Sequence, residues 1–238
     1  MPKKAIIVGA SSGIGKALAL LLSKEGFSVG VTGRRTAALE AIKSHFPKAI
    51  HVLSFDITQE DATNMLDQLA NSMGGVDLFI FSAGIGHLNI DLDYTLENQT
   101  NQLNIVAFTK AMNWALHYFK KQDSGHLVNI SSVAMHRGGR SAPAYNASKA
   151  YQANYLEGLL QKVYAEKRTI YISDIRPGFV DTAMAKGEGL FWVSSKEKAA
   201  KQIYRAIKKK REVAYITKRW ALIGLLLSLL PKAIYKRL

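Results

Sequence analysis

The 238-residue sequence contains no cysteine. Disulfide bridges, thiolate metal sites and thiol nucleophiles are therefore excluded, and a reducing compartment is favoured. No Pro/Gly-rich linker, internal repeat or low-complexity tract divides the chain. The first residues, MPKKAIIVGASSG, place only four apolar residues after a basic pair. This is too short for the apolar region of a signal peptide and is more typical of a buried strand. We expect a cytoplasmic protein.

Acidic residues are scarce near the C-terminus. Residues 196–238 hold 13 basic and 2 acidic residues, a net charge of +11, which leaves only +3 for residues 1–195. A basic segment indicates an anionic partner, either nucleic acid or a lipid surface, unless it is simply a solvated helix face. We expect no nucleic-acid binding, because aromatic residues do not alternate with the basic ones in 196–211 and no known reading motif is present.

Long hydrophobic runs are also missing. The 11 residues from Trp220 to Leu230 are mostly apolar, but as a helix they would extend only about 16 Å, roughly half of a bilayer core. Apolar residues surround nearly the whole circumference of this helix, so something must cover it. Three covers stay open: the protein's own substrate domain, a second subunit, or lipid at the inner face of a membrane. Trp220, Tyr235 and the flanking basic residues are features of a peripheral membrane contact through 218–238.

Seven short apolar runs alternate with segments of helical length. The runs are 5–8, 27–32, 49–55, 76–82, 126–131, 169–175 and 212–217, and helices are predicted within 13–25, 36–46, 60–72, 95–120, 145–167 and 196–210. Nearly continuous apolar strands separated by helices are typical of a parallel sheet with helices on both faces. The sequence predicts an α/β fold with one doubly wound, Rossmann-type domain and a seven-stranded, mostly parallel sheet. This domain covers 1–217, and 218–238 is a basic, apolar helical extension of it.

A glycine-rich turn follows the first predicted strand. Gly9, Gly13 and Gly15 in GASSGIG have the spacing GxxxGxG. Without Cβ atoms the backbone can approach a pyrophosphate, and the amides at the start of the next helix can face the anion. Ser11 and Ser12 add hydroxyl donors. A purely structural turn is the alternative interpretation.

The second predicted strand ends in VTGRR. NAD-binding folds usually have an acid here for the ribose 2′-hydroxyl, whereas arginine suits a 2′-phosphate. In this sequence the acid position is Gly33, followed by Arg34 and Arg35. We therefore favour NADP(H) over NAD(H). Two solvated loop arginines are the alternative.

Tyr145 and Lys149 lie four residues apart in YNASKAYQAN. Positions i and i+4 share a helix face, so the two heads can lie close together. Taken alone, such a pair is more typical of a partly exposed helix than of a site.

In their order and spacing, the motifs from residue 4 to about 217 resemble those of the short-chain dehydrogenase/reductase family. Besides GASSGIG and YNASK, the resemblance rests on Asp56 in SFDITQED, FSAG (81–84), VNISSVA with Ser132, and RPGFVDT (176–182). Two family residues that brace the backbone near the coenzyme are replaced, a Thr by Val8 and an Asn by Ser82. The expected coenzyme contacts are Gly9, Ser11, Ser12, Gly13, Ile14, Gly15, Arg34, Arg35, Asp56, Ile57, Ser82, Ala83, Gly84, Tyr145, Lys149, Pro177, Gly178, Val180 and Thr182.

The resemblance implies an oxidoreductase that interconverts a small carbonyl compound and its alcohol by hydride transfer, and a homo-oligomer. Tyr145 is then the general acid/base, and Lys149 lowers its pKa and holds the nicotinamide ribose. Ser132 bonds the substrate oxygen, and Asn104 anchors a water that relays protons to Lys149. The alternatives are a non-catalytic dinucleotide-binding sensor and a membrane-surface scaffold.

The remaining features concern the substrate. Residues 183–195 match a region that the family uses as a lid. Gly187 and Gly189 allow hinge motion there, and Leu190, Phe191 and Trp192 offer an apolar wall, which favours an apolar carbonyl compound. We expect no metal site, since His87, His126 and His136 lack partners at ligand spacing. His126 is expected to be structural, and His87 and His136 to be substrate contacts or loop residues.

Overall fold

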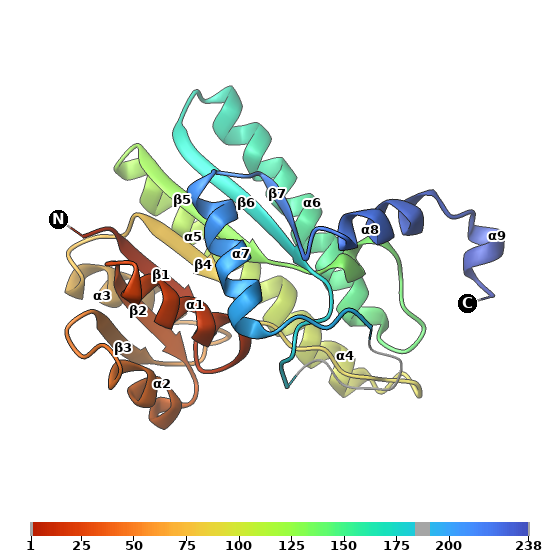
Figure 1. The fold of residues 1–238 in the computed structure, drawn as a ribbon, viewed down its shortest axis with the longest axis horizontal. Helices are drawn as coiled ribbons and strands as arrows, with labels where there is room; N and C mark the ends of the chain where they lie inside the picture. The colour runs from red at the N-terminus through yellow and green to blue at the C-terminus, as the bar shows by residue number, and fades with distance from the viewer. Residues whose placement is uncertain (1, 184–190, 238) are drawn as a thin grey trace.

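A single parallel sheet forms the centre of the molecule (Figure 1). The computed structural model describes residues 2–183 and 191–237. Within these ranges the strands are β1 (Lys4–Val8), β2 (Ser28–Gly33), β3 (Ile50–Ser54), β4 (Leu78–Phe81), β5 (Ser124–Ile130), β6 (Thr169–Pro177) and β7 (Val213–Ile216). Their order is β3-β2-β1-β4-β5-β6-β7, and every neighbouring pair is parallel. The predicted fold class is confirmed.

Helices cover both faces of the sheet. Those before the C-terminal segment are α1 (Gly13–Lys24), α2 (Thr36–Lys43), α3 (Ala62–Ser72), α4 (Tyr94–Asn101), α5 (Phe108–Lys121), α6 (Pro143–Ala165) and α7 (Lys196–Lys208). Side chains of α1, α2 and α7 form one buried cluster, and those of α3, α5 and α6 form the other. β1 supplies Ile7 to the first cluster and Ile6 and Val8 to the second, because successive strand residues point to opposite faces.

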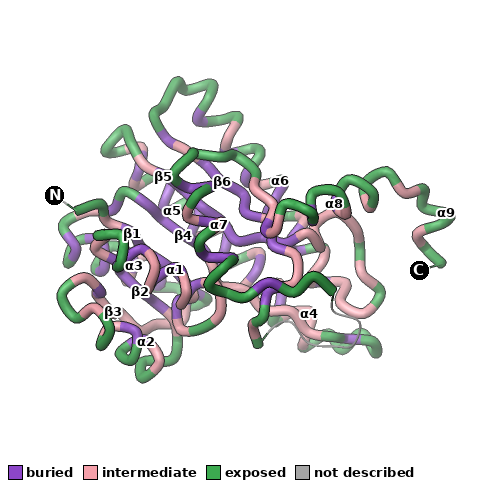
Figure 2. The backbone as a smooth tube through the Cα atoms, in the orientation of Figure 1, coloured by how far each residue is buried: buried purple, intermediate pink, exposed green. Residues whose placement is uncertain are grey.

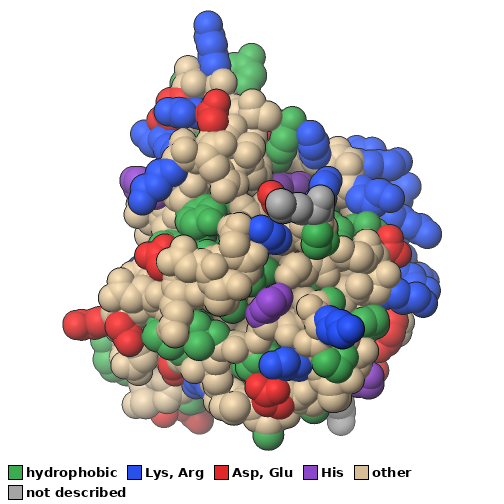
Figure 3. Space-filling view, turned by 90° about the vertical axis from the view of Figure 1, so that its left-hand side faces the viewer, with side chains coloured by type: hydrophobic (Ala, Val, Ile, Leu, Met, Phe, Trp, Pro, Cys, Tyr) green, Lys and Arg blue, Asp and Glu red, His purple; other side chains and the backbone are tan. Residues whose placement is uncertain are grey.

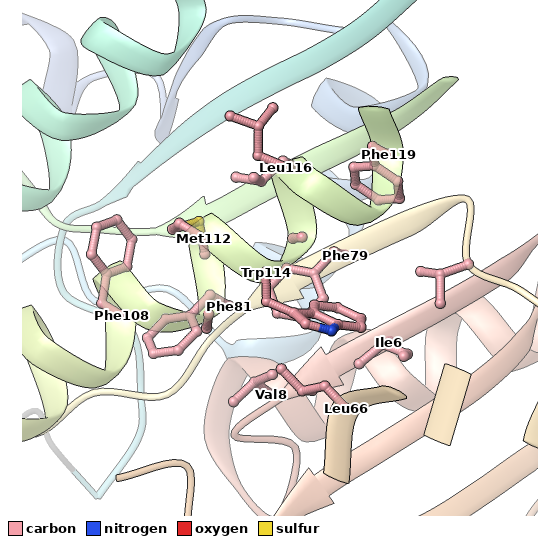
Figure 4. Close-up of a cluster of buried hydrophobic side chains, with 14 of the residues drawn as sticks. Ile6, Val8, Leu66, Phe79, Phe81, Phe108, Met112, Trp114, Leu116 and Phe119 are labelled. Atoms are coloured by element: carbon pink, nitrogen blue, oxygen red, sulfur yellow. The ribbon is translucent and has the colours of Figure 1, made fainter. Parts of the chain in front are cut away.

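The α3–α5–α6 cluster is rich in aromatic rings (Figure 4). Phe79 and Phe81 on β4 pack against Trp114 and Phe108 of α5, with ring centroids 5.4 and 5.5 Å apart. Val8, which replaces a family threonine, is buried in the same cluster. Its side chain therefore contributes to packing instead of offering a polar group to the backbone.

The single helix predicted for 95–120 consists of three parts. Between α4 and α5 lies η1 (Gln102–Ala107), a π-helical stretch. A π-helical stretch is a wider turn that is frequent at functional sites. It contains Asn104, whose backbone and side chain are used in the candidate site described below.

The basic residues of 196–211 lie on the exposed side of α7 and the turn after it. Buried Ala199, Ile203 and Ala206 face the sheet, whereas the lysines and arginines of this segment are all exposed. Lys and Arg side chains gather at the right of Figure 3. This is the side that faces the viewer in Figure 1, where α7 lies in front of the sheet. Much of the charge excess near the C-terminus is therefore the solvated face of an amphipathic helix.

The C-terminal segment extends beyond the β7 edge of the sheet as α8 (Trp220–Leu229) and α9 (Lys232–Tyr235), with most of its backbone exposed (Figure 2). α8 has two sides. Trp220 and Gly224 are buried, while Leu222, Leu225, Leu226 and Leu229 are 55–70% exposed. No helix in the described part of the chain has the length and apolarity needed to traverse a bilayer. Whether 218–238 belongs to the domain of 1–217 stays a prediction.

Candidate active site

The expected site residues lie along one edge of the sheet. The glycine turn follows β1, Arg34 and Arg35 follow β2, Ser82–Gly84 follow β4, Ser132 follows β5 and Gly178 follows β6. All of these are carboxyl ends of parallel strands. The order of the strands reverses between β1 and β4, and ligands of such sheets bind in the crevice outside this switch point.

The turn after β1 leaves no room for side chains. Gly9 has φ +85°, and a Cβ there would collide with the backbone of Ala83. A Cβ on Gly15 would collide with the carbonyl oxygen of Gly9. α1 begins at Gly13, and no side chain caps its free amides. Four unpaired N–H groups at a helix start form an anion site, so the turn fits the pyrophosphate of a dinucleotide.

The two arginines after β2 have different partners. Arg35 donates from Nη2 to Ser11 Oγ (2.9 Å) and Ser12 Oγ (2.8 Å), which places its guanidinium on the glycine turn. The Arg34 side chain is 70% exposed and pairs with Asp56 at 3.8 Å. Asp56 also accepts bonds from the backbone and the hydroxyl of Thr58. A Cβ on Gly33 would lie 3.4 Å from Ser11 Oγ, so position 33 also faces the turn.

Tyr145, Lys149 and Ser132 converge beside the switch point. Lys149 Nζ lies 5.8 Å from the centre of the Tyr145 ring and donates to the Ile130 carbonyl (3.2 Å). Burial lowers the pKa of Lys149 to about 8, and the charge of Asp174 opposes this. Burial also raises the pKa of the Tyr145 phenol, against a hydrogen bond with Ser132. The Tyr145 ring packs closely on Gly86. A phenol and an ammonium that are both desolvated and lie close together are well suited to proton exchange.

Asn104 is fully buried and holds the loop after β4. Its side chain accepts from the Ile85 N–H (3.0 Å) and donates to the Ile85 carbonyl (2.7 Å) and Ser148 Oγ (3.0 Å). Its own backbone carbonyl accepts from Gln152 Nε2 (2.8 Å). Asn104 thus joins the Tyr145–Lys149 helix to the loop, and a water bound there stays a prediction.

The loop after β6 closes the other side of the candidate site. Val180 is buried, and the Thr182 methyl lies 3.3 Å from where a Gly13 Cβ would be. Gly178 has no room for a side chain, because the Trp220 ring lies against it. This ring packs on Phe179, Phe191 and Trp192, with centroids 5.1–6.0 Å apart. Phe191 and Trp192 therefore pack in one aromatic group with Trp220, and their role as a wall for the substrate stays a prediction. Gly187, Gly189 and Leu190 lie outside the described residues.

The histidines are not brought together. His126 is buried and bonds to Ser173 Oγ (2.8 Å), and burial lowers its pKa to about 4. His136 lies between Tyr215 OH (2.9 Å) and Ser228 Oγ (2.8 Å), so its ring joins α8 to the body and is not free for substrate. His87 Nε2 is buried without a partner among the described residues. Residues 2–183 and 191–237 contain no group of three or more His, Asp or Glu suited to a metal ion.

Two residues that the sequence analysis did not assign to this site lie in it. Gln152 bonds to Lys149, and Trp220 supports the Gly178 loop. Gln152 lies three residues after Lys149 on the same helix face, so helical periodicity could have identified it. No sequence signal places Trp220 against Gly178, because the contact is long-range.

A doubly wound parallel sheet with a glycine turn at its switch point is the architecture of a dinucleotide-binding protein. The short chain dehydrogenase family matches residues 3–190 of the chain. An uncharacterized oxidoreductase of Staphylococcus epidermidis is 32% identical over 188 residues, which are 78% of this chain and 81% of that protein. The match includes the glycine turn and the Tyr145–Lys149 helix, and the chain belongs to the short-chain dehydrogenase family. It is an oxidoreductase that depends on an NAD(P) coenzyme.

Solved structures show the same fold. A short-chain dehydrogenase from Burkholderia cenocepacia J2315 in complex with NADP has a TM-score of 0.84 and 19% identity, and the match covers 99% of this chain and 97% of that one. The structure of ElxO with NADP bound has a TM-score of 0.79 and 25% identity, with 91% and 97% covered.

Proposed function

We propose that the protein is an NADP(H)-dependent reductase or dehydrogenase that interconverts a carbonyl compound and its alcohol. The observation that carries this proposal is the convergence of Tyr145, Lys149 and Ser132 beside the glycine turn, at one edge of the sheet. A sensor or scaffold that only binds a dinucleotide has no need of all three side chains. Burial of an ammonium and a phenol costs stability, which favours a role in catalysis.

In the proposed mechanism, the bound coenzyme supplies or removes the hydride. Tyr145 gives its phenolic proton to the substrate oxygen in reduction and takes a proton in oxidation. The positive charge of Lys149 stabilises the phenolate and so opposes the rise that burial causes in the pKa of Tyr145. Ser132, whose hydroxyl contacts the Pro177 carbonyl at 3.5 Å, positions the substrate oxygen. Asn104 positions the helix and the loop that frame these groups.

Substitution of the phenol tests the mechanism. Tyr145→Phe should bind coenzyme and fold normally but lose turnover by at least about 100-fold, because it cannot transfer the proton. Tyr151→Phe on the same helix is the matched control, since its hydroxyl bonds Thr109 at the outer surface. Turnover is followed at the nicotinamide absorbance with a panel of ketones and aldehydes. Near-normal turnover in folded Tyr145→Phe would overturn the proposal.

Preference for NADP(H) is supported by the arginines and by Gly33. Arg35 and the Ser11 and Ser12 hydroxyls form one group on the glycine turn, and Arg34 lies next to it. This group can bind a 2′-phosphate by charge-assisted hydrogen bonds. An acid at position 33 would lie against Ser11 and repel that phosphate. ElxO, a solved structure with a similar fold, has NADP bound.

The rings of Phe179, Phe191, Trp192 and Trp220 support an apolar or partly apolar substrate. They lie beside the Gly178 loop, so a carbonyl carbon near that loop would have its substituent against aromatic carbon. Initial rates with methyl ketones of increasing chain length measure this. Turnover efficiency that does not rise with chain length would contradict it.

We also propose that the exposed side of α8 contacts an anionic lipid surface, at the inner face of a membrane of a cytoplasmic protein. Leu222, Leu225, Leu226 and Leu229 form this side, and residues 218–238 carry five basic and no acidic residues. The like charge disfavours pairing of two such segments and complements anionic headgroups.

Vesicle co-sedimentation tests the lipid contact. The full chain should bind vesicles that contain phosphatidylserine, and less so as salt rises, because exposed charges act over about 10 Å at 0.1 M ionic strength. Replacement of Leu225 and Leu226 by Ser should weaken binding. The matched control is the same replacement at Leu88 and Leu92, which are 65% and 62% exposed in the loop before α4. Equal sedimentation of the two double variants with vesicles would contradict the contact. So would a full chain that does not sediment with vesicles.

A homo-oligomer is proposed as well. Val106 and Tyr151, both partly exposed, line a groove of about 690 Å³ along α5, separate from the candidate site. Exposed apolar surface of this kind supports contact with a second copy. Light scattering after size-exclusion chromatography measures the mass, and a monomer at micromolar concentration would contradict the proposal.

A further inference from the structure

Gln152 is a buried polar side chain with three partners in the candidate site. It has no exposed surface. Its Oε1 accepts from Lys149 Nζ (3.0 Å) and from Asn129 Nδ2 (3.3 Å). Its Nε2 donates to the backbone carbonyl of Asn104 (2.8 Å). One amide therefore connects α6, β5 and η1 at the ammonium of Lys149.

The partners determine which way the amide points. Lys149 can only donate and the Asn104 carbonyl can only accept, so Oε1 must face the ammonium and Nε2 the carbonyl. A flipped amide would lose both bonds. The side chain is thus held in one orientation, and it holds the ammonium in turn.

The remaining groups around Lys149 are few. α6 presents Tyr145, and β6 presents Asp174, which is paired with Arg176 Nε at 2.6 Å. β5 and η1 contribute the Ile130 carbonyl and neutral amides. Two of the three N–H bonds of the ammonium go to Ile130 and Gln152, which leaves one for a ligand in the site.

We propose that Gln152 is the residue that positions the Lys149 ammonium and preserves its charge for Tyr145. This inference rests on the proposed function. A neutral amide suits the task, because it accepts a bond from the ammonium without cancelling its charge. A carboxylate at the same place would cancel the charge, and an apolar side chain would leave it unsolvated. Gln152 has no titratable proton, so it orients Lys149 without passing a proton to it.

Two substitutions separate positioning from mere structural support, because they act oppositely on Lys149. In Gln152→Met the ammonium loses an acceptor, so its charged form becomes less stable. In Gln152→Glu it gains a carboxylate at hydrogen-bond distance, so its charged form becomes more stable. Lys149 must be charged to stabilise the phenolate, so its deprotonation limits alcohol oxidation at high pH.

The experiment is the pH profile of kcat/KM for alcohol oxidation by full-length protein. Relative to the wild type, the alkaline limb should move to lower pH by about one pH unit in Gln152→Met and to higher pH by about one pH unit in Gln152→Glu. Each pH unit is a tenfold change in the protonation equilibrium. In both variants the acidic limb should move to higher pH, because the phenolate of Tyr145 is less stabilised. Gln161→Met and Gln161→Glu, on the exposed side of the same helix, are the controls and should leave both limbs in place.

Loss of activity in both Gln152 variants without opposite movement of the alkaline limb would overturn the proposal. Circular dichroism and coenzyme binding establish that each variant is folded. If Gln152→Met does not fold, Gln152→Glu has nearly the same size and shape and decides alone, and an alkaline limb that stays in place rejects the inference. An active Tyr145→Phe would instead reject the proposed function. If Tyr145→Phe is inactive but both limbs of the pH profile stay in place in the Gln152 variants, only the role of Gln152 is rejected.

Discussion

At the scale of single residues, the site depends on charges that are expensive to bury. Lys149 is 3% exposed, and its pKa falls from 10.5 to about 8 because burial disfavours the ammonium. Its two hydrogen-bond acceptors, the Ile130 carbonyl and the Gln152 amide, are neutral and do not cancel this charge. The same burial that destabilises the ammonium therefore increases its effect on the phenolate.

This burial should be measurable as a pH dependence of stability. Between pH 8 and 10.5 the unfolded chain holds the Lys149 proton more tightly than the folded one, so stability rises with pH, by at most about 1.4 kcal/mol per unit. Lys149→Met lacks this contribution. In urea titrations of coenzyme-free protein, the free energy of unfolding of the wild type should therefore gain on that of the variant between pH 8 and about 9.5. A difference that stays constant with pH would contradict a buried ammonium.

A second residue-scale prediction concerns the coenzyme. The sequence analysis expected both Arg34 and Arg35 to contact the coenzyme, and of the two it is Arg35 that bonds to Ser11 and Ser12. Arg35→Ala should weaken NADPH binding about 10- to 100-fold, the value of a charge-assisted contact, and leave NADH binding unchanged. Arg34→Ala should have a smaller effect, because its side chain is 70% exposed. Fluorescence titration measures both coenzymes. An NADPH preference that Arg35→Ala does not reduce would contradict the assignment.

At the scale of elements, α8 is attached to the body through polar groups. Arg137 donates from Nε to the Leu227 carbonyl (2.6 Å) and from Nη2 to the carbonyls of Ser228 and Leu230. It thereby satisfies the last carbonyls of α8, as a cation at a helix C-terminus does. His136 bonds to Ser228 on the same helix. Both residues belong to the segment after Ser132, so the attachment of α8 begins next to the candidate site.

Removal of this cap should loosen α8 without unfolding the sheet. In Arg137→Ala, backbone amides of 220–230 should exchange with deuterium at least about tenfold faster, while those of β1 and β4 keep their rates, since local openings cost less than global unfolding. Arg140→Ala is the control, because Arg140 is exposed and follows in the same loop. Unchanged exchange in 220–230 would show that Arg137 does not hold the helix.

At the scale of the whole molecule, the C-terminal segment supports the Gly178 loop of the candidate site. Trp220 packs against Gly178, and the Gly178 N–H bonds to the Ile216 carbonyl at the end of β7 (2.7 Å). The segment is therefore both an exposed arm and a wall of the Gly178 loop. The sequence left three possible covers open for 220–230. On one side of this segment the cover is the protein's own body.

Two truncations distinguish these roles. Deletion of 231–238 leaves Trp220 in place and should retain coenzyme affinity. Deletion of 218–238 uncovers Gly178, Phe179 and Ile216, and should weaken coenzyme binding at least about tenfold and promote aggregation through the exposed apolar surface. Coenzyme titration and size-exclusion chromatography of both proteins measure this. A soluble protein lacking 218–238 with normal coenzyme affinity would contradict the role of Trp220.

The sequence by itself predicted the sheet from apolar runs of strand length, the glycine turn from glycines at close approaches, and the shared helix face of Tyr145 and Lys149 from their i, i+4 spacing. Asn104 and Ser132 were assigned only through the resemblance of their motifs to those of the family. Only the tertiary structure decided that Gln152 joins Lys149 to Asn104, that Arg35 lies on the turn, and that Trp220 lies against Gly178. Apart from the Lys149–Gln152 bond within α6, these contacts join residues of different elements, and their geometry depends on how the helices and strands pack. Local sequence does not specify that packing.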